Sequence, residues 1–138
     1  MTGYLLDTNV ISETRKPRPH GAVIAWLQTL PIDQIYLSAV SVGELQAGVE
    51  ATHQHNPAKA DEIELWMEEL ALSYTVLPMD VLCFREWARL MRGRSDDVLE
   101  DMMLAATARI HRLTLATRNV RDFEHVDVQL FNPFSPTK

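Results

Sequence analysis

The sequence predicts an α/β fold, a three-layer α/β/α sandwich around a parallel sheet of about five strands. Short apolar segments alternate along the chain with longer segments whose apolar residues recur at helical spacing. The chain has 138 residues, of which 46% are hydrophobic, and this is enough to bury a sizeable core. We therefore expect residues 1–138 to form a single domain.

The first expected strand is the apolar run 4–6, which an aspartate follows. Residues 8–15 are expected to start a helix with Thr8 or Asn9 as its cap, because short polar side chains accept hydrogen bonds from the first free amides. Residues 16–21 contain two prolines and a glycine, so a loop is expected there.

Residues 23–30 carry apolar side chains at helical spacing, and Pro31 closes that helix. Residues 35–37 are apolar and are expected to form the second strand. Residues 41–44 have the sequence Ser-Val-Gly-Glu, which has the form of a capping box. They are expected to open a helix that runs to about residue 53.

An Asn-Pro pair at 56–57 indicates a turn. Residues 63–70 then form an apolar stripe on a helix whose other face is acidic. The third strand is expected at 74–77. A helix capped by an aspartate is expected over 80–91, and residues 93–97 have the composition of a loop.

The last helix is expected over 98–111, and the last two strands over 113–116 and 128–131. Strands that alternate with helices favour a parallel sheet. Right-handed crossovers then bring the carboxyl ends of all the strands to one edge of the sheet. Polar side chains that follow the strands are therefore expected to lie close together.

The net charge of −6 argues against a protein that holds nucleic acid by bulk electrostatics. It does not argue against an enzyme that acts on nucleic acid, because a carboxylate site is itself acidic and a bound metal reverses the local sign. The ten arginines, against three lysines, suit bidentate contact with phosphate. A single cysteine and the lack of a secretory signal or a long apolar run indicate a cytoplasmic protein without membrane association.

Acidic residues stand at four places where an expected strand hands over to a helix or loop, namely Asp7, Glu44, Asp101 and Asp122. Each has an ordinary structural explanation, such as helix capping, the helix dipole or a turn. Together, at one edge of one sheet, they would repel one another unless a cation lay between them. Mg²⁺ or Mn²⁺ suits such oxygen ligands, so the pattern predicts metal-dependent phosphoryl chemistry.

Two further polar residues lie beside these positions. Asp97 stands four residues before Asp101 and shares its face if the helix starts early, although a loop or capping role is favoured. Asn119 is a neutral amide that either orients a water or a metal ligand or serves as a turn residue. The histidines and Cys83 lack the spacing of a zinc site.

Five segments together carry a resemblance to a known family: 5–13 (LLDTNVISE), 37–45 (LSAVSVGEL), 101–108 (DMMLAATA), 116–123 (ATRNVRDF) and 130–134 (LFNPF). In this order they resemble the PIN-domain family and, within it, the VapC toxins of bacterial toxin–antitoxin pairs and the similar FitB proteins. The match covers the whole chain, so a PIN-like fold is expected.

The resemblance implies a Mg²⁺- or Mn²⁺-dependent ribonuclease that leaves a 5′-phosphate and a 3′-hydroxyl. It implies Asp7, Glu44 and Asp101 as the acidic core, with Asp7 and Asp101 as direct metal ligands. We expect Asp122 at the fourth acidic position, with Asn119 assisting. The resemblance also implies a homodimer, held inactive by a VapB-like antitoxin whose basic segment enters the acidic groove and which alone contacts operator DNA.

We expect metal-activated water to attack the scissile phosphorus in line, on an RNA substrate. The arginines nearest the motifs are candidate phosphate contacts, namely Arg15, Arg18, Arg118 and Arg121. The alternative without enzymatic activity is a regulatory binding module that acts through a DNA-binding antitoxin. A phospho-accepting receiver domain is disfavoured, because only one acidic residue follows the first strand and the last lysine lies beyond the last strand.

Overall fold

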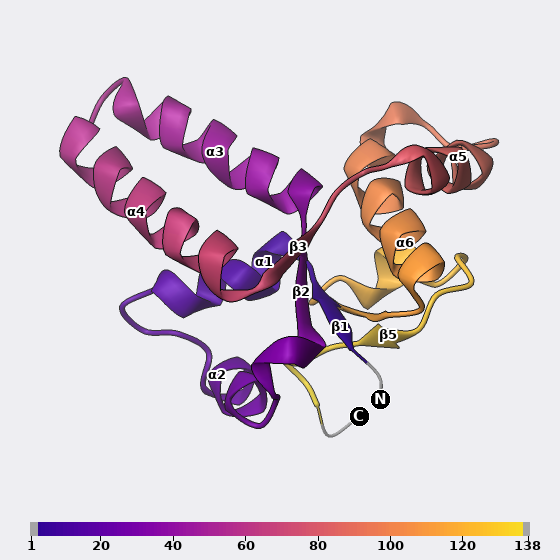
Figure 1. Cartoon of the computed structure of the whole chain (residues 1–138), viewed down its shortest axis with the longest axis horizontal. Coiled ribbons are helices and arrows are strands. Elements are labelled where there is room, and N and C mark those ends of the chain that lie inside the picture. The colour runs from indigo at the N-terminus through magenta and orange to yellow at the C-terminus, as the bar shows by residue number, and fades with distance from the viewer. Residues whose placement is uncertain (1–2, 137–138) are drawn as a thin grey trace.

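A computed structural model describes residues 3–136. Its centre is a five-stranded sheet in the order β3-β2-β1-β4-β5, and every neighbouring pair is parallel (Figure 1). The strands are β1 (Tyr4–Leu6), β2 (Ile35–Ser38), β3 (Thr75–Leu77), β4 (Thr114–Ala116) and β5 (Leu130–Phe131). The predicted fold class, an α/β sandwich on a parallel sheet, is confirmed.

Six α-helices connect the strands. They are α1 (Thr8–Ile11), α2 (Gly21–Gln28), α3 (Ala39–His53), α4 (Pro57–Ser73), α5 (Val81–Leu90) and α6 (Leu99–His111). Four short 3₁₀ helices complete the connections: η1 (Ser12–Arg15), η2 (Ile32–Gln34), η3 (Asp96–Val98) and η4 (Val120–Phe123). None of the helices in the described part of the chain is both long and apolar enough to cross a membrane.

The sheet is apolar on both faces, as a sheet with helices on each side must be. Leu5 and Leu115 belong to a cluster that includes the buried side of α6. Leu6 and Ala116, the next residues along the same strands, belong to a second cluster with residues of α1 and α2. Because side chains alternate along a strand, the same short runs supply both layers of the core.

Two helix pairs stand over the carboxyl ends of the strands. In Figure 1 the hairpin of α3 and α4 rises on one side, and α5 with α6 rises on the other. The long α3–α4 pair is joined by a short turn at His55–Asn56, where the Asn56 side chain accepts from the amide of Lys59. Residues that follow β1, β2 and β4 are therefore placed between the two pairs.

The expected caps of two helices are wrong. The first helix is capped by Asp7, whose carboxylate accepts from the amide of Thr8, and it spans only Thr8–Ile11 before continuing as η1. The helix expected to open at a capping box begins earlier, at Ala39. Its cap is Ser38, whose Oγ accepts from the amide of Val40 at 3.0 Å. Ser38 ends β2, so the chain turns into the helix three residues before the predicted start.

This correction yields a matched pair of substitutions. Ser38→Ala removes the cap of α3 and is expected to lower the free energy of unfolding by about 1 kcal/mol. Ser41→Ala is expected to be neutral or stabilising, because Ser41 Oγ is buried without a hydrogen-bond partner in the described residues. Urea denaturation of both variants measures the difference. A larger loss for Ser41→Ala would restore the capping-box interpretation.

Other differences are small. The fifth strand is limited to two residues instead of four, and the third and fourth strands each begin one residue later than expected. Residues 93–97 were expected to form a loop, and the last two of them lie in η3. Asp122 lies in η4 and not in an irregular loop. The ends of short elements depend on single hydrogen bonds, which local patterns do not determine.

Candidate active site

Four carboxylates predicted from the sequence follow the ends of the strands. We call them the acidic rim: Asp7 directly after β1, Glu44 in the second turn of α3 after β2, Asp101 in the first turn of α6, and Asp122 in η4 after β4. The parallel sheet explains their placement, because the carboxyl ends of β1, β2 and β4 share one edge.

Both oxygens of Asp7 are held. Its Oδ1 accepts from the amide of Thr8 at 2.6 Å, and its Oδ2 accepts from the hydroxyl of Thr117 at 2.8 Å. The Thr117 hydroxyl in turn accepts from the amide of Asn119 at 3.0 Å. The amide of Asp7 donates to the carbonyl of Ala116 at 2.9 Å, which extends the β1–β4 ladder to the site. Asp7 therefore has one orientation, set by the neighbouring strand.

Thr8 connects two members of the acidic rim. Its amide donates to Asp7, and its hydroxyl donates to Glu44 Oε1 at 2.8 Å. Glu44 is therefore bonded to the start of α1 and not back to Ser41, which excludes the capping-box role for this carboxylate. The cap of α3 is already supplied by Ser38.

The rim carboxylates influence one another. Burial, followed by the charges of Asp7 and Asp122, raises the pKa of Asp101 from 3.8 to about 6. Burial also raises the pKa of Asp7, against the lowering effect of its hydrogen bonds, and the charge of Asp122 adds to the rise. Burial raises the pKa of Glu44 as well, and Glu100 and Asp7 contribute. Negative charge at this edge is thus only partly compensated by the protein.

Several contributing residues were not identified from the sequence. Thr8 and Thr117 orient rim carboxylates through their hydroxyls, and Glu100 adds a charge that acts on both Asp101 and Glu44. Thr117 stands directly after β4 in the segment 116–123, and this position was the only sign in the sequence that it could reach the site. Asp97 is exposed and is not among the charges that raise the pKa of Asp101. Asn119 acts here through its main-chain amide.

The acidic rim fits a hard divalent cation in donor chemistry and in charge. Its donors are carboxylate oxygens, and a cation between them would relieve the repulsion that, after burial, raises the pKa of Asp101. Among residues 3–136, however, no three such side chains already stand together as a ligand cluster. Binding would therefore require side-chain rotations, and Asp101 and Glu44 are only partly buried.

Comparison with known proteins decides the family. The sequence matches the PIN domain family over residues 4–129. The chain belongs to the PIN domain family. PIN domains are nucleases.

This PIN domain is similar to curated toxins along nearly its whole length. It is 37% identical to Toxin FitB of Neisseria gonorrhoeae, with 94% of this chain and 97% of the relative covered. It is 39% identical to VapC ribonuclease Y4jK of Sinorhizobium fredii, with 96% and 98% covered. The crystal structure of FitAcB from Neisseria gonorrhoeae is similar with a TM-score of 0.84 at 36% identity, covering 95% of this chain and 98% of that one. FitAB bound to an IR36 DNA fragment is similar with a TM-score of 0.82 at 36% identity, covering 95% of both chains.

The four candidate arginines of this PIN domain do not form one group. Arg15 lies over the ring of Trp66, at 5.8 Å from the ring centroid, and lines a cavity of about 280 Å³ with residues of α4. Arg118 lies over Phe134 at 3.9 Å. Arg18 and Arg121 are exposed. Among the four, only Arg118 directly follows a residue that holds the acidic rim.

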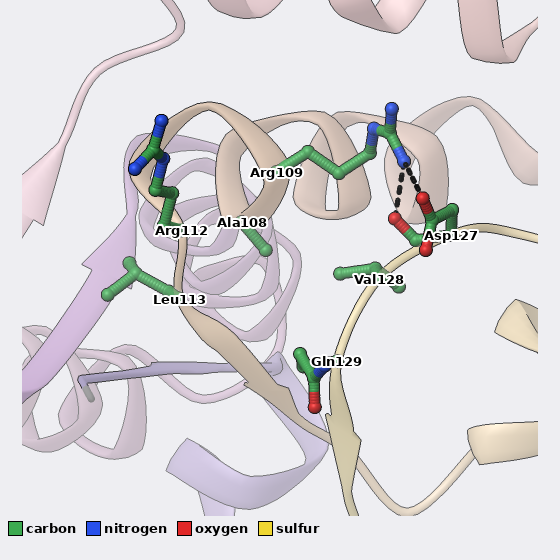
Figure 2. Close-up of a pocket in the computed structure, with 7 residues that line it drawn as sticks. All are labelled: Ala108, Arg109, Arg112, Leu113, Asp127, Val128 and Gln129. Carbon is green, nitrogen blue, oxygen red and sulfur yellow. Dashed lines mark hydrogen bonds and ion pairs between the residues drawn. The ribbon is translucent and has the colours of Figure 1, made fainter.

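A cavity of about 360 Å³ lies at the other end of this PIN domain. Figure 2 shows it between the end of α6 and the segment before β5, lined by Ala108, Arg109, Arg112, Leu113, Asp127, Val128 and Gln129. Arg109 spans this region, with Nε at 2.7 Å from Glu86 and an ion pair to Asp127 at 3.5 Å. No member of the acidic rim lines this cavity, so it is separate from the candidate active site.

Proposed function

We propose that this chain is an endoribonuclease that depends on Mg²⁺ or Mn²⁺, and that it is the toxin component of a VapBC-like toxin–antitoxin system. The single observation that carries the proposal is the acidic rim at the shared edge of the sheet, where burial, and then the charges of the neighbouring carboxylates, raise the pKa values of Asp7 and Asp101. The similarity to proteins named Toxin FitB and VapC ribonuclease Y4jK supports it.

In this mechanism Asp7 and Asp101 hold the metal ion, and Glu44 and Asp122 complete the acidic site. When bound, the ion supplies a more acidic water and neutralises negative charge on the phosphate. Thr117 and Thr8 keep Asp7 in one orientation, so its carboxylate needs no reorganisation during the reaction. The main-chain amide of Asn119 donates to the Thr117 hydroxyl and thereby helps to hold the group that bonds to Asp7.

The test is RNA cleavage by the purified chain, separated from any bound partner, on a single-stranded RNA pool of randomised sequence. We expect cleavage with Mg²⁺ or Mn²⁺ and its loss on chelation, with products that carry a 5′-phosphate and a 3′-hydroxyl by mass spectrometry. Cleavage that is insensitive to chelation, or products with a 2′,3′-cyclic phosphate, would contradict the proposal.

The proposed partner is a VapB-like antitoxin that places a basic segment in the acidic groove and carries the operator-DNA contact. The relatives' structures of FitAB with DNA and of FitAcB support this assignment. Co-expression of the chain with the product of the adjacent reading frame should yield a complex that forms in the cytoplasm and does not cleave RNA. If the isolated chain never cleaves RNA but the complex binds DNA, the regulatory binding module is the better description.

We also propose a homodimer, with a second copy covering an apolar surface at the start of α5. Val81, Leu82 and Phe84 are 73%, 57% and 43% exposed there, so three large apolar side chains are exposed within the first turn of one helix. Light scattering of the isolated chain should give twice the mass of one copy. A monomeric mass at micromolar concentration would exclude this interface.

A further inference from the structure

The ring of Phe134 is positioned by the turn that follows β5. The Asn132 side chain accepts from the amide of Phe134 at 2.9 Å, and the Asn132 carbonyl accepts from the amide of Ser135 at 3.1 Å. His20 packs edge-on against the ring, with centroids 5.1 Å apart. Phe134 also packs on the core cluster that contains Leu6. Its ring is therefore held on several sides.

The guanidinium of Arg118 lies on this ring, with Cζ at 3.9 Å from the centroid. The main chain of Arg118 is fixed as well, because its amide donates to Asn9 Oδ1 at 3.2 Å and because Thr117 before it bonds to Asp7. Stacking on an aromatic face orients a guanidinium and leaves its edge N–H groups available. The position of Arg118 is thus determined from both its main chain and its side chain.

The guanidinium of Arg118 forms no ion pair with the described residues. Within residues 3–136, no carboxylate oxygen lies within 4.0 Å of its guanidinium. Its charge contributes to lowering the pKa of Glu13, after the larger effects of Lys16 and of the His20 amide. It is not among the causes that shift the pKa of Asp7 or Asp101. Arg118 therefore adjoins the acidic rim along the chain through Thr117, while its guanidinium lies on Phe134 without a carboxylate partner in the described residues.

We propose that Phe134 is a positioning residue, which holds the Arg118 guanidinium to bind an RNA phosphate that flanks the scissile one. The inference rests on the proposed ribonuclease function and assigns part of its substrate binding. A planar guanidinium with its edge exposed suits bidentate contact with phosphate. Arg15 has a comparable aromatic partner in Trp66, but it lies at the α4 cavity and does not adjoin a residue that holds Asp7.

The first test is steady-state cleavage of the randomised RNA pool. Arg118→Ala is expected to raise the apparent KM about tenfold with kcat within about twofold, as for a lost charged hydrogen bond outside the reacting centre. Phe134→Leu keeps an apolar side chain without a π face and is expected to raise KM roughly threefold to fivefold. Phe134→Tyr keeps the face and should restore the KM of the wild type.

The second test separates this inference from the proposed function. The RNA pool is bound to Asp7→Asn protein, which is not expected to cleave, and affinity is followed by fluorescence anisotropy at several salt concentrations. Adding Arg118→Ala should weaken binding about tenfold and reduce the salt slope by about 0.7, the amount for one phosphate on a single strand. The control Arg112→Gly removes an equal charge at the far end of α6, where its φ of 56° suits glycine, and should not change affinity.

Each outcome decides the inference. Unchanged binding in Arg118→Ala, or a loss in Phe134→Leu that Phe134→Tyr does not restore, overturns it. A fall in kcat with unchanged KM also overturns it, because the residues would then act at the reacting centre. If the wild type binds RNA but never cleaves it, the proposed function fails. Binding of the same RNA pool to Asp7→Asn protein that also carries Phe134→Leu or Phe134→Tyr still decides the role of Phe134. Thermal unfolding of Phe134→Leu shows whether a loss reflects misfolding.

Discussion

Asp7→Asn is expected to lower the rate of RNA cleavage about a thousandfold or more while the fold is preserved. Asn still accepts a hydrogen bond from the amide of Thr8, so the cap of α1 is retained. What is lost is one negative charge and one proposed metal ligand. Removing the charge also lowers the pKa of Asp101, because Asp7 is the largest charge that raises it.

The measurement is the initial cleavage rate with Mg²⁺, together with the melting temperature. The melting temperature should stay the same or rise, since repulsion within the acidic rim is reduced. The matched control is Asp33→Asn, an equal loss of charge on the exposed η2 segment at the opposite edge of the sheet. Asp33→Asn should keep full activity. Full activity in folded Asp7→Asn would show that Asp7 is not part of the active site.

The second large effect is a stability that depends jointly on pH and on divalent metal. The pKa of Asp101 in the folded state is about 6, above its ordinary 3.8. A raised pKa means that the folded state favours the protonated form. The associated stabilisation is fully present below about pH 4 and is lost as the pH rises through 6. Asp7 and Glu44, whose pKa values are also raised, act in the same direction.

Without metal, this part of the stability is expected to fall by about 1 kcal/mol between about pH 4 and pH 7, after allowance for solvent screening of the half-exposed Asp101. Mg²⁺ or Mn²⁺ should offset the loss, because a cation favours the charged form. The metal-induced rise in melting temperature should therefore be roughly 3–5 °C near pH 8 and close to zero near pH 4.

Thermal unfolding with metal or chelator across this pH range measures the effect, and Asp101→Asn isolates it from the other titrating groups. The wild type and the variant should differ in slope between about pH 4 and pH 7 and should respond differently to metal. An equal metal response at both ends of the range would show that the ion binds somewhere other than the acidic rim.

The sequence predicted the order of strands and helices because each short apolar run is bounded by residues that stop it. Leu5 and Leu6, for example, are followed by an aspartate. The fold class follows because such short apolar runs alternate with helices along the chain. The capping error at α3 has a local cause: Ser38 and Ser41 are both of a residue type that caps helices, and they stand three positions apart. Only the hydrogen bonds at the end of β2 select Ser38, and the pattern alone does not contain them.

Glu13 and Thr117 illustrate what local patterns do not show. Glu13 reads as an ordinary polar residue near a helix end, yet it is 3% exposed, because Lys16 and the amide of His20 both bond to it. Thr117 reads as the end of a strand, yet its hydroxyl orients an aspartate 110 positions away. The partners of Glu13 lie only three and seven residues along the chain, but the residue pattern does not show that the loop folds back onto its carboxylate. Thr117 depends on a partner that the chain brings near only when the sheet forms.

The amino-acid sequence by itself determined the type of donors, oxygen from carboxylates, and their positions at the ends of strands and the starts of helices. The tertiary structure decided which of them face one another. It placed β1 between β2 and β4, so that Asp7 bonds to Thr117, approaches Glu44 through Thr8, and lies within electrostatic range of Asp101. The physical reason is that strand order and register are set by packing over the whole sheet, whereas sequence patterns report only local preference.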